Sequence, residues 1–164
     1  MSIVTTIKDF HKMYFEALPI SLADIKLEEQ NNKYCGVRFK LNDHSVRFRK
    51  AKLTPNKAGF FVVAWEKDDN NNNQAYSYSE SPNYLMVYCE TESRQGIFIF
   101  PKDALLKNNI LSTDKQKGKM GFRVYPTWEE LSSKQALQSQ KWQSEYFVNL
   151  SNGEAIEDFK SIFS

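Results

Sequence analysis

The chain has 164 residues, of which 41% are hydrophobic and 14% aromatic, and its formal net charge is +2. This length and composition predict one domain, spanning 1–164, with a packed core, and they exclude a disordered chain. No apolar run approaches the roughly 18 residues that a membrane span needs, and no signal peptide is evident, so we expect no membrane partner. Because the net charge is small, an anionic partner has to be recognised by a local patch of cations.

The N-terminal half predicts a helix followed by a β-hairpin. Apolar residues recur at spacings of three and four over 3–18, and Pro19 ends this helix. The segment 20–33 leaves a short strand and loop packing open as alternatives. Residues 34–41 and 45–49 alternate between apolar and basic positions around a turn at 42–44, which is typical of a hairpin.

The hairpin presents its cations on one face. Arg38, Lys40, Arg47 and Arg49 alternate with apolar residues, so all four are expected to point away from the core. Such a face is either a solvated surface or one wall of an anion site. A break at 54–59 carries Lys57, and the apolar run 60–65 then predicts a buried strand.

The second half predicts further strands and helices. Residues 68–83 are rich in asparagine and are expected to form an exposed loop, to which we assign no function. Strands are expected over 84–89, 97–100 and 120–125, with a helix over 102–107. These elements predict a mixed α/β (α+β) fold with a single, largely antiparallel sheet and flanking helices.

A late helix is expected over 133–150, with a capping box at 127–130 or a second start at Ser133. Gln140 and Gln143 fall within its otherwise apolar stripe. A buried amide without partners costs about 1–3 kcal/mol, so both side chains should bond backbone groups or face a cleft.

Motifs for common enzyme chemistry are missing. The sequence has no Walker loop, no GxGxxG and no GxSxG. His11 and His44 are too few and too scattered for a zinc site, and Cys35 and Cys89 are expected to be buried free thiols of a reducing cytoplasm. We therefore predict no cofactor, no metal and no catalytic residue, and we leave open whether the protein is an enzyme.

Four runs of residues carry a resemblance to a known family. They are Phe48-Arg49-x-Ala51-Lys52-x-Thr54-Pro55-x-Lys57-x-Gly59-x-Phe61-Val62-x-x-Trp65, Gly96-x-Phe98-x-Phe100-Pro101, Lys117-Gly118 followed by Arg123-Val124-Tyr125-Pro126-x-Trp128, and Lys134-Gln135-Ala136-x-x-x-Gln140-x-Trp142-Gln143-x-x-Tyr146-Phe147. Over about 34–148 the chain resembles the MepB-like family of bacterial proteins. The resemblance implies a cytoplasmic bacterial protein, associated with a multidrug-efflux locus, whose domain is related to the restriction-endonuclease-like fold.

Nucleases of that fold use an acidic residue and an acidic-x-lysine triplet to hold a divalent metal. Here Glu66 is followed directly by Lys67, so on a strand the two side chains face opposite ways. The nuclease pattern is absent or degraded in this strand, which puts metal-dependent cleavage in doubt.

Binding of nucleic acid or another phosphate-type anion in a basic cleft is the function that these observations favour. The alternatives are a small-molecule-binding accessory protein linked to multidrug resistance and an unusual metal-dependent nuclease. The partner is expected to be nucleic acid or a phosphorylated small molecule, and the oligomeric state is open. The candidate binding residues are Arg47, Arg49, Lys52, Lys57, Trp65, Arg123, Trp128, Gln140 and Gln143.

Overall fold

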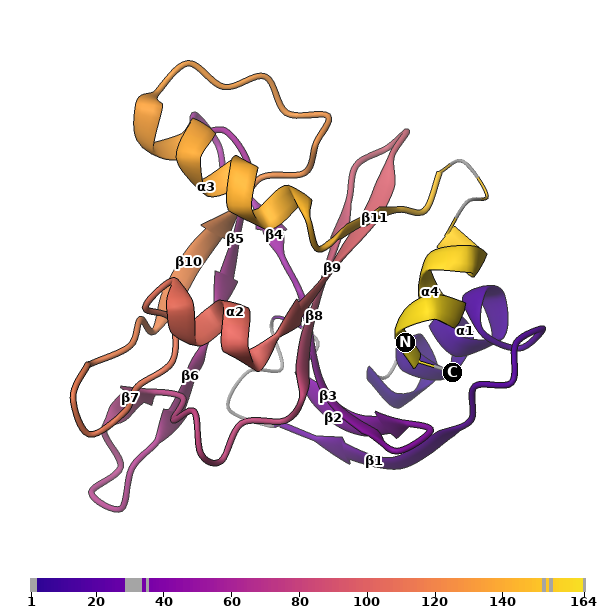
Figure 1. Cartoon of the computed structure of the whole chain (residues 1–164), viewed down its shortest axis with the longest axis horizontal. Coiled ribbons are helices and arrows are strands. Elements are labelled where there is room, and N and C mark those ends of the chain that lie inside the picture. Colours follow the sequence, from indigo (N-terminus) through magenta and orange to yellow (C-terminus); the bar gives the residue numbers. More distant parts are fainter. Residues whose placement is uncertain (1–2, 29–33, 35, 152, 154, 164) are drawn as a thin grey trace.

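The computed structural model describes residues 3–28, 34, 36–151, 153 and 155–163. Its helices and strands follow one another from a helix at the N-terminal end to a helix at the C-terminal end (Figure 1). The elements are α1 (Ile3–Tyr14), β1 (Leu22–Leu27), β2 (Val37–Leu41), β3 (His44–Lys50), β4 (Lys52–Leu53), β5 (Phe60–Val63), β6 (Trp65–Lys67), β7 (Asn73–Ala75), β8 (Tyr84–Glu90), β9 (Gln95–Pro101), α2 (Lys102–Lys107), β10 (Gly121–Val124), α3 (Lys134–Ser144), β11 (Phe147–Asn149) and α4 (Ala155–Phe163).

The main sheet has six strands in the order β1-β2-β3-β8-β9-β11. Neighbouring strands are antiparallel except for β3 and β8, which are parallel. The expected mixed α+β class with a largely antiparallel sheet is confirmed, but the strands form three sheets and not one. Because β3 pairs directly with β8, the chain between them leaves the main sheet and forms β4, β5, β6 and β7, which pair as β10-β5-β4 and β6-β7.

The hairpin β2-β3 has the alternation that its sequence predicts. Val37 pairs with Phe48 and Phe39 with Val46, so the apolar side chains share one face. That face packs under α1 and α4 in a first core cluster rich in phenylalanine. In Figure 1 these two helices lie together on one side of the main sheet.

A second core cluster fills the opposite face of the main sheet. Phe98 and Phe100 of β9 stack with ring centroids 5.2 Å apart. Around them pack apolar residues of β5, β10 and the α2 region. Both faces of the main sheet are therefore covered, which agrees with the continuous apolar run in the sequence of β9.

The late helix is shorter than its sequence predicts. It begins after Ser133, whose hydroxyl accepts a hydrogen bond from Ala136 N–H, and it ends at Ser144. Phe147–Asn149 then forms β11, which pairs with β9, and Asn149 lies opposite Gly96. A Cβ atom on Gly96 would lie 2.3 Å from Cζ of Phe147, so the glycine provides the space that the phenylalanine ring needs.

The asparagine-rich segment is not exposed throughout. Asn73–Ala75 pairs with β6, and Tyr76 is buried, with 3% of its surface exposed. Tyr76 belongs to the second core cluster. The short apolar signal at Ala75 and Tyr76 is masked by the polar residues around it, which is why composition predicted a loop.

None of the helices in the described part of the chain has the length and apolar character needed to cross a membrane. Of the two cysteines, Cys89 is buried and free, whereas Cys35 lies outside the described residues.

Gly59, in the turn before β5, has a positive φ of 78°, and Gly153, far from this turn, has a similar φ of 74°. Comparing alanine variants of the two glycines therefore tests how closely the turn packs against β10. A Cβ atom on Gly59 would lie 2.7 Å from the carbonyl oxygen of Val124, whereas Gly153 has nothing within 4 Å. We predict that Gly153→Ala costs about 1–2 kcal/mol, from backbone strain alone. Gly59→Ala should cost at least about 1 kcal/mol more, because β10 must also shift.

Urea denaturation of the two variants and the wild type measures this difference. Equal losses of unfolding free energy in the two variants would contradict the close packing of the turn against β10.

Candidate functional site

Two arginines of β3 are buried and do not form a solvated face. Arg49 is fully buried and Arg47 is 6% exposed. They point away from the first core cluster, as their alternation predicts, but β3 lies inside the sheet between β2 and β8. Two charged groups in this position need compensating partners, since an unpaired buried charge is strongly unfavourable.

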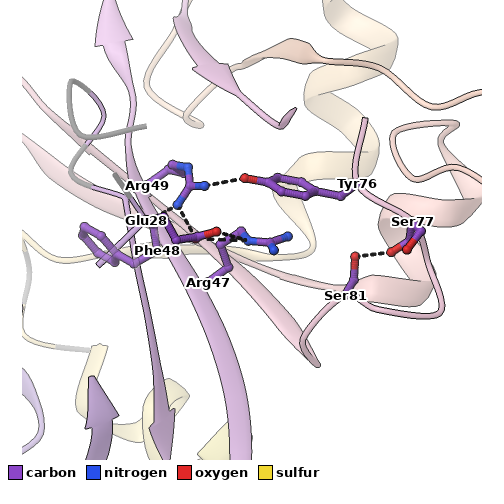
Figure 2. Close-up of polar contacts among 7 residues, drawn as sticks. All are labelled: Glu28, Arg47, Phe48, Arg49, Tyr76, Ser77 and Ser81. Carbon is purple, nitrogen blue, oxygen red and sulfur yellow. Dashed lines mark hydrogen bonds and ion pairs between the residues drawn. The ribbon is translucent and has the colours of Figure 1, made fainter. Parts of the chain in front are cut away.

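Glu28 provides the compensating charge. Its carboxylate accepts hydrogen bonds from Arg47 Nε at 3.2 and 3.3 Å and from Arg49 Nη1 at 2.8 Å. Figure 2 shows the carboxylate between the two guanidinium groups, at the end of the strand that precedes the hairpin. One carboxylate therefore serves two arginines.

Tyr76 completes the group, which we call the arginine cluster (Glu28, Arg47, Arg49 and Tyr76). The guanidinium carbon of Arg47 lies 3.4 Å from the centroid of the Tyr76 ring, which is a cation–π contact. Arg49 Nη2 donates a hydrogen bond to the Tyr76 hydroxyl oxygen (Figure 2). The asparagine-rich segment thus supplies a residue that fixes both arginines.

The charges of the cluster shift the pKa values of the carboxylates around it. Burial raises the pKa of Glu28, but Arg49 and Arg47 lower it by more, so it lies below its ordinary value. Burial raises the pKa of Glu66 on β6, and Glu80 and Glu28 add to the rise, although Arg47 opposes it. Glu28 is therefore ionised at neutral pH as the counter-ion of the two arginines.

A small cavity lies beside the cluster and is lined by Arg47, Tyr76, Ser81 and apolar residues of β8 and α2. Its volume is about 10 Å³, which is room for at most one water molecule. In this conformation the arginine cluster has no space for an organic ligand.

An open cleft lies elsewhere, between the end of α2, strand β10 and helix α3. Its volume is about 510 Å³, within the range of ligand sites. We call it the β10/α3 cleft. Its lining residues are Lys107, Asn108, Asn109, Ile110, Lys119, Gly121, Phe122, Arg123, Tyr125, Ser133, Gln135, Ala136, Gln138, Ser139, Trp142 and Gln143.

The charged residues in the lining of this cleft are all positive. Lys107, Lys119 and Arg123 line it, and none of the described residues in its lining is aspartate or glutamate. Within the described part of the chain, none of these three cations forms an ion pair with a carboxylate. The two lysines are exposed, so the β10/α3 cleft offers uncompensated positive charge to the solvent.

Arg123 also has a structural task. Its Nε and Nη2 donate to the carbonyl oxygen of Ala58, at 3.1 and 2.7 Å, and Nη2 donates to Thr54 Oγ1 at 2.7 Å. These bonds fix the turn before β5. Arg123 therefore links the turn at 54–59 to the cleft, and only part of its guanidinium is left for a ligand.

The two glutamines of α3 bond backbone groups, one of the two alternatives that their positions allow. Gln143 is buried; its Oε1 accepts from Tyr125 N–H at 2.8 Å and its Nε2 donates to the Arg123 carbonyl at 2.9 Å. Gln140 Nε2 donates to the carbonyls of Pro126 and Glu129. The amides therefore anchor α3 to β10, and Gln143 also lines the cleft.

The remaining candidate residues lie in neither place. Lys52 Nζ lies 4.8 Å from the Tyr34 ring centroid, and Lys57 is exposed in the turn before β5. Trp65 contacts Lys67, and Trp128 packs edge-on against Phe147 with centroids 5.6 Å apart. The expected single cleft is thus divided: Arg47 and Arg49 share the arginine cluster, whereas Arg123 and Gln143 share the β10/α3 cleft.

Sequence reasoning missed Lys107 and Lys119 in the cleft and Glu28 and Tyr76 in the cluster. The lysine-rich character of 112–119 is visible in the sequence, and it is the signal that could have drawn attention to Lys119. Glu28 and Tyr76 have no local signal, because both depend on contacts with β3 that are distant along the chain.

Carboxylates suited to a metal do not gather in the described residues, which hold no group of three or more His, Cys, Asp or Glu side chains with metal-binding geometry. Glu90 accepts from Lys50 Nζ at 2.5 Å and from the Tyr88 hydroxyl at 3.0 Å. On β6, Lys67 Nζ lies 5.4 Å from the Trp65 ring centroid, so the Trp65 and Lys67 side chains share one face of the strand. Glu66 faces the other way and does not form an acid–lysine pair with Lys67.

Comparison with known proteins defines the family. The profile of the MepB-like family matches residues 28–149, and the chain belongs to this family. The fold is similar to that in the crystal structure of MepB, with 39% sequence identity and a TM-score of 0.81 over 90% of this chain and 97% of that one. A search of the curated proteins gave no match.

Glu28→Gln tests the electrostatic role of the carboxylate. Because the folded-state pKa of Glu28 is lowered, its stabilisation is complete above the unfolded pKa of about 4.3 and is lost as the pH falls through the folded pKa. We predict that the variant loses about 3 kcal/mol of unfolding free energy at pH 7, and that this deficit is smaller at about pH 3, below the unfolded pKa.

Asp24→Asn is the matched control, since it removes the same charge from β1. Asp24 pairs with Lys40 at 3.8 Å in an exposed position, and asparagine tolerates the positive φ of 55° found there. The control should change stability by less than about 1 kcal/mol at either pH. A deficit for Glu28→Gln that is independent of pH would refute the ionic role.

Proposed function

We propose that the β10/α3 cleft binds phosphate-type anions and that nucleic acid is its partner. The observation that carries the proposal is the combination of Lys107, Lys119 and Arg123 with a described lining that contains no carboxylate. In a protein with a net charge of only +2, such a local excess is the kind of patch that attracts polyanions.

The other polar groups of the cleft suit a sugar-phosphate backbone. Amide and hydroxyl side chains, including Asn108 and Ser139, line it next to the cations. Such groups are common donors to phosphate oxygens. Trp142 packs against Phe100 with ring centroids 5.3 Å apart and is half-buried at the cleft, where it can stack a base for about 1–3 kcal/mol.

The cleft fits a small organic ligand less well. Small-molecule sites are mostly apolar and enclosed, whereas this one is open and lined largely by polar side chains. Its positive charge repels organic cations. A role as an accessory protein that captures cationic drugs is therefore the weaker interpretation, and a phosphorylated small molecule is the version of it that the charges allow.

The relation to the restriction-endonuclease-like fold and the cytoplasmic setting are part of the same proposal. A sheet that joins antiparallel strands to the parallel pair β3-β8 fits that relation. The buried, free Cys89 thiol fits a reducing compartment. We propose binding without cleavage, because the acidic-x-lysine pattern of such nucleases is not found at Glu66-Lys67.

The double variant Lys107→Gln/Lys119→Gln tests the proposal. Single-stranded DNA should bind the wild type with a salt dependence that reflects its phosphate contacts, at about 0.7 units of slope in log K against log salt per contact. We predict that the double variant weakens binding at low salt and reduces the magnitude of this slope by about 1.4. Fluorescence anisotropy at several salt concentrations measures both quantities.

Lys8→Gln/Lys12→Gln is the control, because it removes the same charge from exposed positions on α1. The control should retain the wild-type slope. Absence of binding at low salt in the wild type, or an equal loss in both double variants, would overturn the assignment of the cleft.

A further inference from the structure

The arginine cluster combines two cations on an inner strand of the main sheet with a carboxylate that comes from the end of an edge strand. We propose that Arg47 and Arg49, with Arg38 beside them, form a recessed second site for a terminal phosphoryl group, and that Glu28 occupies the position of this group in the free protein. The site is separate from the β10/α3 cleft and does not depend on its proposed function.

The arginines are held in place before any ligand arrives. Both lie on β3, which is hydrogen-bonded to β2 on one side and to β8 on the other. Arg47 is stacked on the Tyr76 ring, and Arg49 donates to the Phe48 carbonyl at 2.9 Å and to the Tyr76 hydroxyl. Preorganised donors of this kind bind an anion without further ordering.

Glu28 reaches the arginines from the edge of the main sheet. It follows the last residue of β1, which is an edge strand of the main sheet, and its side chain is 14% exposed. Its backbone N–H donates to the Gly36 carbonyl at 2.9 Å, so the strand pairing continues to this point. Rotation about the side-chain torsions of Glu28 withdraws the carboxylate and leaves that backbone bond intact.

The carboxylate uses only part of the available donors. Arg47 reaches it through Nε alone, and the Nη atoms of Arg47 donate no hydrogen bond within the described residues. Arg49 Nε is buried without a partner. A phosphoryl group has more oxygens and more charge, and it can take Nε and the adjacent Nη of Arg47 together, the two-point geometry that arginine forms with phosphate.

The depth of the site selects the end of a molecule. Arg49 is fully buried, and Arg38, which pairs in register with Arg47, is half-buried at the outer side of the cluster. A phosphodiester inside a chain carries substituents on both sides and cannot enter such a recess. With Glu28 withdrawn, the three arginines have one nearby carboxylate within the described residues, Glu66, which interacts with Arg47 and Arg38, so a terminal dianion restores the charge balance.

Calorimetric titration with inorganic pyrophosphate tests the site. A site closed by Glu28 for more than nine-tenths of the time shows an affinity at least about tenfold below its open value. Glu28→Gln should therefore bind pyrophosphate at least about tenfold more tightly than the wild type, and adding Arg38→Gln should remove most of this gain. Asp24→Asn, which makes the same charge change on β1, should not change the affinity. Equal affinities for Glu28→Gln and Asp24→Asn would overturn the proposal.

Two further arms locate the gain and define its source. Glu28→Gln combined with Lys107→Gln/Lys119→Gln should retain the gain in pyrophosphate affinity. Loss of this gain would mean that pyrophosphate binds in the β10/α3 cleft, and it would overturn the second site whether or not the cleft binds nucleic acid. A gain for a 5′-phosphorylated oligonucleotide over its 5′-hydroxyl form assigns the site to nucleic-acid ends, and a gain for pyrophosphate alone assigns it to free phosphoryl groups.

Glu28→Asp replaces Glu28→Gln in these titrations if Glu28→Gln does not fold. Aspartate keeps the charge but has a shorter side chain, so Glu28→Asp should also bind pyrophosphate more tightly than the wild type. Unchanged affinity in a folded Glu28→Asp variant would contradict the proposed site.

Discussion

The position of Arg47 and Arg49 on a strand inside the main sheet is the constraint on which much of the structure depends. Each guanidinium is removed from water, and each needs partners that the neighbouring strands do not supply. Glu28 comes from the edge of the sheet and Tyr76 from the segment that leaves it. Tyr76 also belongs to the second core cluster, so this one residue links the buried charges to the apolar packing on that face of the main sheet.

The protein treats positive charge in two different ways. In the arginine cluster, a carboxylate and an aromatic ring compensate the cations, and the remaining cavity holds at most one water molecule. In the β10/α3 cleft, the cations meet amides, hydroxyls and a tryptophan, with no carboxylate among the described lining residues. The first arrangement is closed and the second is open, although both lie outside the first core cluster. This contrast is the reason that we propose an anion site at β10 and α3.

Local patterns predicted most of the fold, because period-two alternation and apolar runs mark β2, β3, β5, β8 and β9 directly. The division into three sheets could not be predicted, since the parallel pairing of β3 with β8 is set by packing and not by either strand alone. The helix predicted over 133–150 ends early because Phe147 pairs with Phe98 of β9 and its ring packs against Gly96, long-range contacts that override a helical pattern.

The candidate site was predicted only in part, because some of its residues have local sequence signals and others depend on tertiary contacts. Arg123 and Gln143 were found from their positions, and their neighbour Lys119 lies in a segment whose lysine content was visible. The arginines of β3 were expected to face a cleft with Arg123, but the sequence does not show that Glu28 and Tyr76 bury them. A charge pattern on a strand defines which face it occupies, and only the tertiary structure defines what covers that face.

Chemical-shift mapping of the ¹⁵N-labelled protein during titration with single-stranded DNA measures whether nucleic acid binds in the β10/α3 cleft. Binding in this cleft should shift the amide signals of Lys107–Asn109, Lys119–Arg123 and the first two turns of α3 together, while those of α1 and α4 stay unchanged. Shifts confined to α1 and α4, or no shifts at low salt, would contradict it.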